Sequence, residues 1–325
     1  MSELTKEKIY KKELIKAGAT GNNNLARIRS LQGGGGGATT KLESTRMSKR
    51  KKYIGGEWVY KQWNIESEFM INSGYNIWTD GDNIYYSIGT TQYVLDKETS
   101  TWKLKTWKGL TDFNGQYIWT DGDNIYYTRV YYNQYTQNYV LNKKTSTWEV
   151  KEWTGLENYH EYTAMSIWTD GENIYLNQNF VLDKENSRWE TKEFVNTITN
   201  FQATNIWTDG ENIYYSEDTR HFVLDKETST WNERVWDGLT SFSGFNIWTD
   251  GDNIYYSNGS EQYYLDLGEG SQWVEKTWDG FNSWRNQFKG GFIWTDGENI
   301  YLTTGSGYDK INYVLNPQKA VYVKL

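Results

Sequence analysis

The sequence has 325 residues, with no cysteine and only two histidines, His160 and His221. Without cysteine the chain forms no disulfide and performs no thiolate chemistry, so the redox state of its compartment has no bearing on its fold. No stretch approaches the roughly 18 consecutive apolar residues of a membrane-spanning helix, and we expect no membrane insertion. The first residues, MSELTKEKIYKKELIKAG, have no apolar core of the signal-peptide type, and we expect no export by the standard secretory route.

Aliphatic residues are scarce, but aromatic residues are abundant: the chain has 18 Trp, 27 Tyr and 11 Phe. Each buried aromatic side chain removes roughly 150–250 Å² of surface from water, so these residues can carry a core. The chain is long enough for one large domain or two ordinary ones.

The net charge of −8 is divided unevenly along the chain. Residues 1–52 contain 13 Lys and Arg against 4 Glu, a net charge of +9, whereas the remainder contains 21 basic against 38 acidic residues, a net charge of −17. A basic segment on an acidic body is typical either of a solvated tail or of a segment that docks onto an acidic partner. The sequence therefore predicts two parts, a basic arm at residues 1–52 and a body at residues 53–325.

One segment of the body, IWTDGDNIYYS at residues 77–87, returns five more times in nearly the same form. Its tryptophans stand at positions 78, 119, 168, 207, 248 and 294, at intervals of 39 to 49 residues. Self-similarity at this period is typical of solenoids, propellers and arrays, and the interval matches a four-stranded propeller blade.

Each repeat contains four short segments without helical periodicity. In the first copy these are IWT before an Asp-Gly turn, then NIYYS, YVLDK and TWKLKTW. β-branched and aromatic residues predominate, and glycine tolerates the positive φ that a tight turn needs. The pattern predicts four antiparallel strands per repeat, and hence an all-β, six-bladed propeller.

The number of copies predicts how the ring closes. The first three segments occur six times, the last set at residues 292–316, but the fourth segment follows only five of them. A sixth copy, EWVYKQW at residues 57–63, precedes the first repeat. We therefore predict that this N-terminal segment is the outer strand of the last blade, which leaves no open ring edge. The alternative is that KAVYVKL at the C-terminus supplies the strand, with Tyr322 at the tryptophan position.

The run of Asp-Gly turn, NIYYS and YVLDKETSTW is similar to the kelch repeat of β-propellers over residues 57–316, although the kelch diglycine after the second strand is replaced by residues such as Tyr-Tyr-Ser. In that family a third-strand tyrosine and a fourth-strand tryptophan pack between blades. The matching pairs here are Tyr93/Trp102, Tyr139/Trp148, Phe180/Trp189, Phe222/Trp231 and Tyr264/Trp273. The repeat also resembles proteins encoded among the structural genes of phages and prophages of low-GC Gram-positive bacteria.

The repeated Asp-Gly-(Asp/Glu)-Asn segment has two interpretations, a calcium loop or a hairpin turn. It lacks the spacing of an EF-hand loop, so we interpret it as a turn and expect no metal or other cofactor. The Asp-box of sialidases places its tryptophan after the Asp-x-Gly, whereas the tryptophan here comes first. Oxidase propellers of the galactose-oxidase type need His, Tyr and Cys around copper, and this chain has no Cys and only two His. No carboxylate pair stands out for glycoside hydrolysis, and we expect no enzymatic activity.

In an up-and-down blade, the turns between strands one and two and between strands three and four share one face. The turns between strands two and three share the other face with the links between blades, and here nearly all the length variation falls on that second face. Recognition often uses variable loops on a rigid scaffold, and Tyr, Trp and Arg are common hot-spot residues. The alternative is drift in unused loops. The candidates for recognition are Tyr131, Tyr132, Tyr135, Tyr159, His160, Trp284 and Arg285.

The arm does not share the repeat. Residues 2–18 predict a short helix with one narrow apolar face, residues 22–31 a second one, and GGGGG at residues 33–37 a flexible linker. Helices this short are marginal in water, so we expect the arm to become ordered on a partner protein, and its basic clusters give only weak support to nucleic acid as that partner. The candidate anchoring residues are Ile9, Tyr10, Leu14, Ile15, Arg27, Arg29, Arg46, Lys49 and Arg50.

These features favour a non-catalytic structural protein of a phage particle, made in the bacterial cytoplasm and located in the virion. In this interpretation residues 1–52 dock onto other virion proteins, and the variable face meets a glycan or protein of the host surface. The alternative is a free, lectin-like propeller. A multivalent lectin would repeat its pockets in several blades, whereas the variable face does not repeat. An intracellular kelch adaptor would need a companion domain, and none is visible in the arm.

Overall fold

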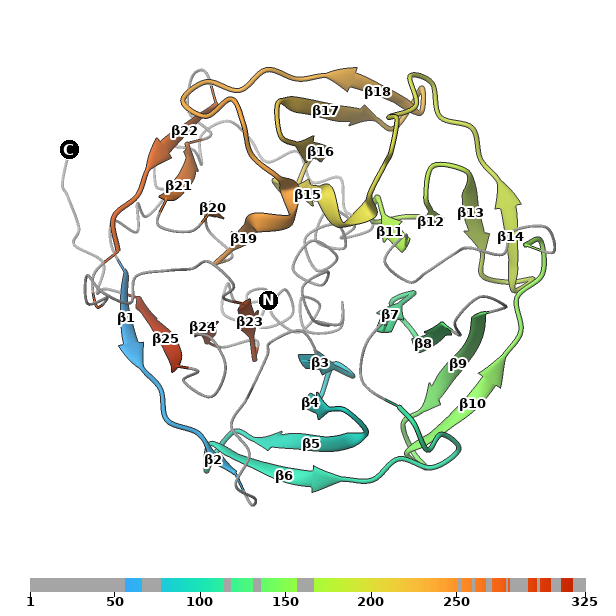
Figure 1. The fold of residues 1–325 in the computed structure, drawn as a ribbon. Coiled ribbons are helices and arrows are strands. Elements are labelled where there is room, and N and C mark those ends of the chain that lie inside the picture. The colour runs from blue at the N-terminus through green and yellow to red at the C-terminus, as the bar shows by residue number, and fades with distance from the viewer. Residues whose placement is uncertain are drawn as a thin grey trace, which may run out of the picture.

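The structure is a computed structural model, and it describes residues 56–65, 77–113, 118–130, 136–156, 167–250, 253–258, 261–266, 271–278, 280, 292–296, 299–304 and 311–317. Within these residues the chain forms six sheets arranged in a ring (Figure 1). This confirms the predicted all-β, six-bladed propeller. The boundary predicted at residue 52, the arm and its helices lie outside the described residues.

The strands occupy four positions from the axis to the rim. The innermost strands are β3 (Ile77–Thr79), β7 (Ile118–Thr120), β11 (Ile167–Thr169), β15 (Ile206–Thr208), β19 (Ile247–Thr249) and β23 (Phe292–Thr295). The second strands are β4 (Ile84–Ile88), β8 (Ile125–Val130), β12 (Ile174–Leu176), β16 (Ile213–Glu217), β20 (Ile254–Asn258) and β24 (Ile300–Thr304). The third strands are β5 (Thr91–Asp96), β9 (Thr136–Asn142), β13 (Phe180–Asp183), β17 (Arg220–Asp225), β21 (Glu261–Asp266) and β25 (Ile311–Pro317).

The outer strands are β6 (Thr101–Lys105), β10 (Thr147–Lys151), β14 (Arg188–Thr191), β18 (Thr230–Glu233), β22 (Gln272–Glu275) and β1 (Gly56–Tyr60). Blades 1 to 5 follow the chain from β3 to β22, and blade 6 consists of β23, β24, β25 and β1. Two short 3-10 helices, η4 (Ala203–Asn205) and η5 (Gly244–Asn246), precede the innermost strands of blades 4 and 5. No helix in these residues is long and apolar enough to cross a membrane.

Blade 6 closes with the N-terminal strand, as the copy number predicts. β1 pairs antiparallel with β25, and Trp58 lies opposite Leu315 just as Trp102 lies opposite Leu95 in blade 1. In Figure 1 the blue β1 lies beside the red β25, although the two are more than 250 residues apart in the sequence. The C-terminal alternative is therefore wrong, because β1 already occupies the outer edge of β25.

The core is divided among the six junctions between blades rather than gathered at one centre. Each innermost Ile-Trp-Thr segment is enclosed by its neighbours, and in blade 1 all three residues are buried. At the first junction Trp78 from β3, Trp107 from the link and Trp148 from β10 pack together, with ring centroids 5.4–6.0 Å apart. Five junctions contain such a tryptophan triad, and Phe194 replaces the link tryptophan at the third. The repeated aromatic residues are therefore interblade packing, as predicted.

One of the predicted aromatic pairs is wrong by one residue. In blade 5 Leu265 pairs with Trp273, and Tyr263, not Tyr264, lies opposite Tyr256 as Tyr93 lies opposite Tyr86 in blade 1. Tyr263 packs in the same cluster as Trp273, whereas Tyr264 packs against the next junction. The turn before Trp273 is one residue longer than in the other blades, so a fixed spacing of nine residues selects the wrong tyrosine.

A backbone belt joins the blades at the rim. After four of the outer strands the chain runs parallel to the beginning of the next outer strand, as in the bridges Lys108 to Thr147 and Asp237 to Gln272. At the closing junction β2 (Asn64–Ile65) makes the same parallel contact with β6. In blade 4 the next residue, Gly238, has φ +79°, and a Cβ there would lie 2.0 Å from the Trp273 carbonyl oxygen. Glycine is needed here by both its backbone conformation and the close approach.

Candidate functional site on the variable face

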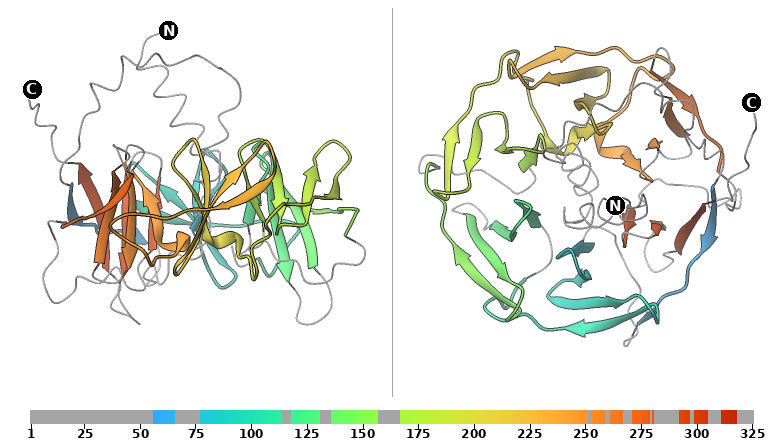
Figure 2. Two further views of the ribbon diagram at one scale, coloured as in Figure 1. Left: turned by 90° about the horizontal axis from the view of Figure 1, so that it is seen from above. Right: turned by 180° about the vertical axis from the view of Figure 1, so that it is seen from behind.

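The two faces of the ring are distinguished by direct contacts, and we name them the turn face and the variable face. On the turn face, Lys226 Nζ in the strand three–four turn of blade 4 donates to the carbonyl oxygen of Asp170 in the strand one–two turn of blade 3, at 2.9 Å. On the variable face, the link residue Phe242 donates its N–H to the carbonyl oxygen of Asp218, in the strand two–three turn of blade 4, at 2.8 Å. This confirms the predicted grouping of turns and links, and Figure 2 shows the ring edge-on and from behind.

The repeated turn is a structural unit that satisfies its own polar atoms. In blade 3 Asp170 Oδ1 accepts the backbone N–H groups of Glu172 and Asn173, at 2.9 and 2.7 Å. Asp170 Oδ2 accepts the hydroxyl of Tyr175 at 2.7 Å, and the Tyr175 ring stacks on Trp168. Burial, together with the bond to Asp170, raises the pKa of Tyr175 far above its usual range. The same Tyr-to-Asp bond is present in all six blades.

These carboxylates hold the turn together, which agrees with the hairpin interpretation of the segment. Each Asp oxygen faces N–H and O–H donors from its own hairpin. Among the residues that the structure describes, no group of three His, Cys, Asp or Glu side chains is placed to hold a metal ion.

Four lysines connect the turns of neighbouring blades on the turn face. Lys97, Lys143, Lys184 and Lys226 each donate to the backbone carbonyl of the turn aspartate one blade back. The four aspartates that receive them, Asp296, Asp80, Asp121 and Asp170, are 3–8% exposed. Blades 5 and 6 carry Leu267 and Pro317 at the lysine position, and the aspartates there, Asp209 and Asp250, are only half-buried. The lysine stem therefore covers the turn that its ammonium group binds.

All the residues predicted for recognition lie outside the described residues: Tyr131, Tyr132, Tyr135, Tyr159, His160, Trp284 and Arg285. The same is true of the candidate anchoring residues Ile9, Tyr10, Leu14, Ile15, Arg27, Arg29, Arg46, Lys49 and Arg50. Both sets stay predictions. The described part of the variable face nevertheless contains polar residues that differ from blade to blade.

On the variable face, glutamine side chains tie the hairpin to the following link in blades 1 and 3. In blade 1 Gln92 Nε2 donates to the Phe113 carbonyl at 2.8 Å. In blade 3 Gln178 exchanges two hydrogen bonds with the backbone of Ile198, at 2.8 and 3.0 Å. Part of this face is therefore structural, because Gln92 on β5 and Gln178 in the turn before β13 make the same kind of contact from different places in the blade.

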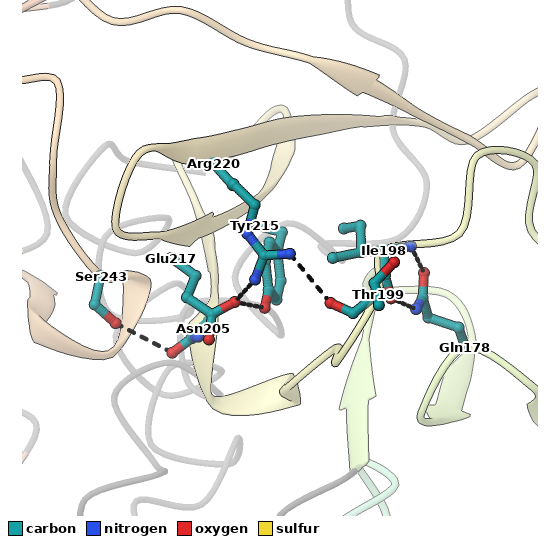
Figure 3. A network of polar contacts seen from close by, with 8 residues as sticks. All are labelled: Gln178, Ile198, Thr199, Asn205, Tyr215, Glu217, Arg220 and Ser243. Carbon is teal, nitrogen blue, oxygen red and sulfur yellow. Dashed lines mark hydrogen bonds and ion pairs between the residues drawn. The ribbon is translucent and has the colours of Figure 1, made fainter.

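Blade 4 carries a connected polar network on the described part of this face (Figure 3). At the hairpin tip, Arg220 forms an ion pair with Glu217, and its Nη1 donates to the Thr199 carbonyl at 3.3 Å. Tyr215 donates its hydroxyl to Glu217 Oε2 at 2.9 Å. Burial and the bond to Glu217 raise the pKa of Tyr215 to about 12. Nearby, Ser243 Oγ donates to Asn205 Oδ1 at 3.1 Å, which connects the link to the residue before β15.

This network offers oriented polar groups to a ligand. The side chain of Arg220 is 44% exposed and that of Glu217 23% exposed, while the Tyr215 side chain beneath them is buried. A guanidinium has five N–H donors in a fixed plane, and only some of them are used within the protein. The exposed pair can therefore bind a partner through several hydrogen bonds without rearranging.

The sequence did not single out these residues, although a signal exists. The hairpin tip SEDTRH is the strand two–three turn of blade 4, where Glu217 lies opposite Arg220. The equivalent pair is Ile88 and Thr91 in blade 1 and Asn258 and Glu261 in blade 5, and neither is a pair of opposite charges. An opposite-charge pair at a hairpin tip is recognisable by comparing the repeats position by position. Asn205 and Ser243 carry no such signal, because their contact depends on how two links pack.

No family model and no curated protein matches the chain. Among solved structures, the chain is similar to the extracellular domain of a protein described as a one-component system, BT4673 from B. thetaiotaomicron, with 14% identity, a TM-score of 0.43, and coverage of 82% of this chain and 39% of that one. It is also similar to YjhT, with 11% identity, a TM-score of 0.46, and coverage of 81% of this chain and 97% of that one. At these values neither similarity carries an argument about function.

Proposed function

We propose that the protein is a non-catalytic structural component of a phage particle. Residues 1–52 dock onto other virion proteins, and the propeller is displayed with its variable face toward a protein or carbohydrate partner. The kelch-like repeat, and its resemblance to repeats encoded among phage structural genes, support this placement.

The observation that carries the proposal is the position at which the arm joins the ring. The first described residue, Gly56, lies opposite Pro317, the last residue of β25. The end of a third strand lies on the turn face, since the strand three–four turn begins there. The segment before Gly56 therefore joins the ring on the turn face, opposite the variable loops. A protein anchored through this segment presents its variable face away from the anchor.

The charges of the arm and of the turn face bear on how the chain attaches to its partner. Asp82, Asp123, Glu172 and Glu211 of the repeated turns are exposed on the turn face. The arm is basic, with a net charge of +9 over residues 1–52. An acidic surface on the partner would therefore attract the arm and repel the turn face, which favours attachment by a flexible tether rather than by a flush contact with the turn face.

The recognition role is assigned to the variable face, where Arg220 and Glu217 form the exposed part of the blade 4 network. Arg, Tyr and Trp are frequent at binding hot spots, and Tyr131, Tyr132 and Trp284 are predicted for the same face from their place in the repeat. The described side chains favour a polar ligand that accepts and donates several hydrogen bonds.

Incorporation into purified particles tests the proposal. We expect the full-length chain to be present in particles of the phage that encodes it, and a chain without residues 1–45 to be missing. Arg220→Ala serves as the matched control, because it changes the opposite face and is expected to incorporate normally. Absence of the full-length chain from particles would contradict the structural role and favour the free lectin-like propeller. Incorporation of the truncated chain would contradict the role of the arm.

A further inference from the structure

The third-strand residue just before the packing Tyr or Phe follows one rule in four of the six blades, and blade 4 is one of the two exceptions. In four blades this position holds an amide side chain whose oxygen accepts a hydroxyl from the second strand. The distances are 2.8 Å for Thr128 to Asn138, 2.5 Å for Ser257 to Gln262 and 2.7 Å for Thr303 to Asn312, and Ser87 donates to Gln92 in the same way. In blades 2, 5 and 6 the hydroxyl also accepts the indole N–H of the innermost strand, which completes a buried chain of hydrogen bonds.

Blade 4 has His221 at this position, opposite Ser216. The ring is 4% exposed, and Nε2 lies 3.2 Å from the carbonyl oxygen of the link residue Thr240. Because a carbonyl only accepts, Nε2 carries the proton and Nδ1 is the bare nitrogen of a neutral ring. Nδ1 has no hydrogen-bond partner among the described residues.

The ring also holds the link in place. His221 stacks on Phe242 with the ring centroids 4.2 Å apart and an angle of 14° between the planes. Phe242 donates its N–H to the Asp218 carbonyl at 2.8 Å, and the next residue, Ser243, donates to Asn205 at 3.1 Å. Residues 240–243 therefore connect His221 to the polar network of the variable face. Figure 3 shows the last of these contacts, between Ser243 and Asn205.

The charged groups around this position do not compensate a charge on the ring. The elements packed here carry Glu217 on β16, Asp218 in the turn, Arg220 on β17, Glu233 on β18, and Arg234 and Asp237 after it. Glu217 is paired with Arg220, and none of these groups is hydrogen-bonded to the ring. Burial, opposed only by the bond to Thr240, lowers the pKa of His221 below its usual value.

We propose that His221 makes this part of the variable face pH-sensitive. Proton uptake turns Nδ1 into a buried N–H donor without an acceptor, and a charged ring in this position is destabilised by loss of hydration. The protonated ring leaves the site, the stacking on Phe242 is lost, and residues 240–243 separate from the hairpin. Mild acid thus opens the link that borders the blade 4 network, while the rest of the ring stays folded.

The direction of the effect follows from proton binding. The open state takes up a proton at the ordinary histidine pKa of about 6.5, and the closed state only at a lower pH. The ratio of molecules with a closed link to molecules with an open link is therefore constant above about pH 6.5. Below this pH the ratio falls by up to about tenfold per pH unit, until the buried ring itself takes up a proton.

The test uses the fact that the chain has only two histidines. NMR titration of the full-length protein gives two histidine signals, and His160→Gln and His221→Gln assign them. We expect His221 to titrate well below pH 6.5. We also expect the hydrogen-exchange protection factor of the Phe242 amide, corrected for intrinsic pH dependence, to fall by about tenfold between pH 7 and pH 5.5, in line with the linkage relation.

The control variants follow the rule of the repeat. His221→Gln installs the amide of blades 1 and 5, and His221→Asn installs that of blades 2 and 6, so one of the two is expected to keep the fold. In the folded variant the protection of Phe242 should not change with pH. A His221 midpoint at or above 6.5, or an equal loss of protection in the variant, would overturn the proposal.

Discussion

Trp231 illustrates, at the scale of the single residue, why the ring depends on its aromatic side chains. It is 1% exposed and packs against Trp168, Phe194 and Phe201 at the junction between blades 3 and 4. We expect Trp231→Ala to lower the free energy of unfolding by about 3–5 kcal/mol, the usual cost of a large-to-small change in a packed core. Equilibrium unfolding in urea measures this loss. A cost below about 1 kcal/mol would show that the tryptophan is not part of the core.

The tyrosines of the repeated turns predict a loss of stability at high pH. Burial is the main cause that raises the pKa of Tyr85, Tyr126, Tyr175 and Tyr214 above the usual value, with the turn aspartates adding to it. A free tyrosine ionises near pH 10, so the unfolded chain releases these protons first. The contribution of these protonated tyrosines to the free energy of unfolding is complete below about pH 10 and is lost as the pH rises above it.

Ultraviolet titration of tyrosinate, followed together with circular dichroism, measures this effect. We expect one group of tyrosines to ionise in the folded protein and a second group to ionise only as the fold is lost. Ionisation of all 27 tyrosines near pH 10 in a protein that stays folded would contradict the role given to the Tyr-to-Asp bonds.

At the scale of the element, the lysines of the turn face connect one blade to the next. Lys143 and Lys144 are neighbours in the same turn and both are exposed, but only Lys143 donates to the Asp80 carbonyl of the preceding blade. We expect Lys143→Met to lower the free energy of unfolding by about 0.5–1.5 kcal/mol, the net value of one hydrogen bond. Lys144→Met should stay within about 0.5 kcal/mol of the parent, as for ordinary surface changes. Thermal unfolding of the two variants measures the difference in stability. An equal loss of stability in both variants would mean that the Lys143 hydrogen bond does not stabilise the fold.

The strands could be predicted well from the sequence because the same pattern of apolar, aromatic and turn residues occurs in every repeat. Six copies of one hairpin made strand identity, blade number and even the origin of the closing strand readable from periodicity and count. It failed where a single blade departs from the average: one additional residue before Trp273 moved the packing tyrosine from Tyr264 to Tyr263. The Asn205–Ser243 contact was beyond reach for another reason, since it joins two links whose packing no local pattern encodes.

At the scale of the whole molecule, the closing strand and the arm make separate predictions. Deletion of residues 1–45 leaves β1 intact, and we expect the propeller to keep one cooperative thermal transition. Deletion of residues 1–63 removes Trp58, which packs on Trp248 and Trp278 at the last junction, and opens the edge of β25. We expect this longer deletion to unfold or aggregate. Loss of the cooperative transition in the shorter deletion would refute the separation of arm and ring.

The proposed function rests on the claim that the turn face points toward the particle and the variable face away from it. Site-specific labelling of intact particles tests this claim most directly. The chain has no cysteine, so Thr219→Cys on the variable face and Asp82→Cys on the turn face, both at exposed positions, each introduce one thiol. Their reaction with a bulky thiol reagent is compared between free protein and particles. The account predicts equal reaction of both variants in free protein, and in particles a retained reaction of Thr219→Cys with a slower reaction of Asp82→Cys, because the particle lies on the turn-face side of the ring. Protection of Thr219→Cys with free reaction of Asp82→Cys would show that the variable face is the anchored one, and would contradict the account.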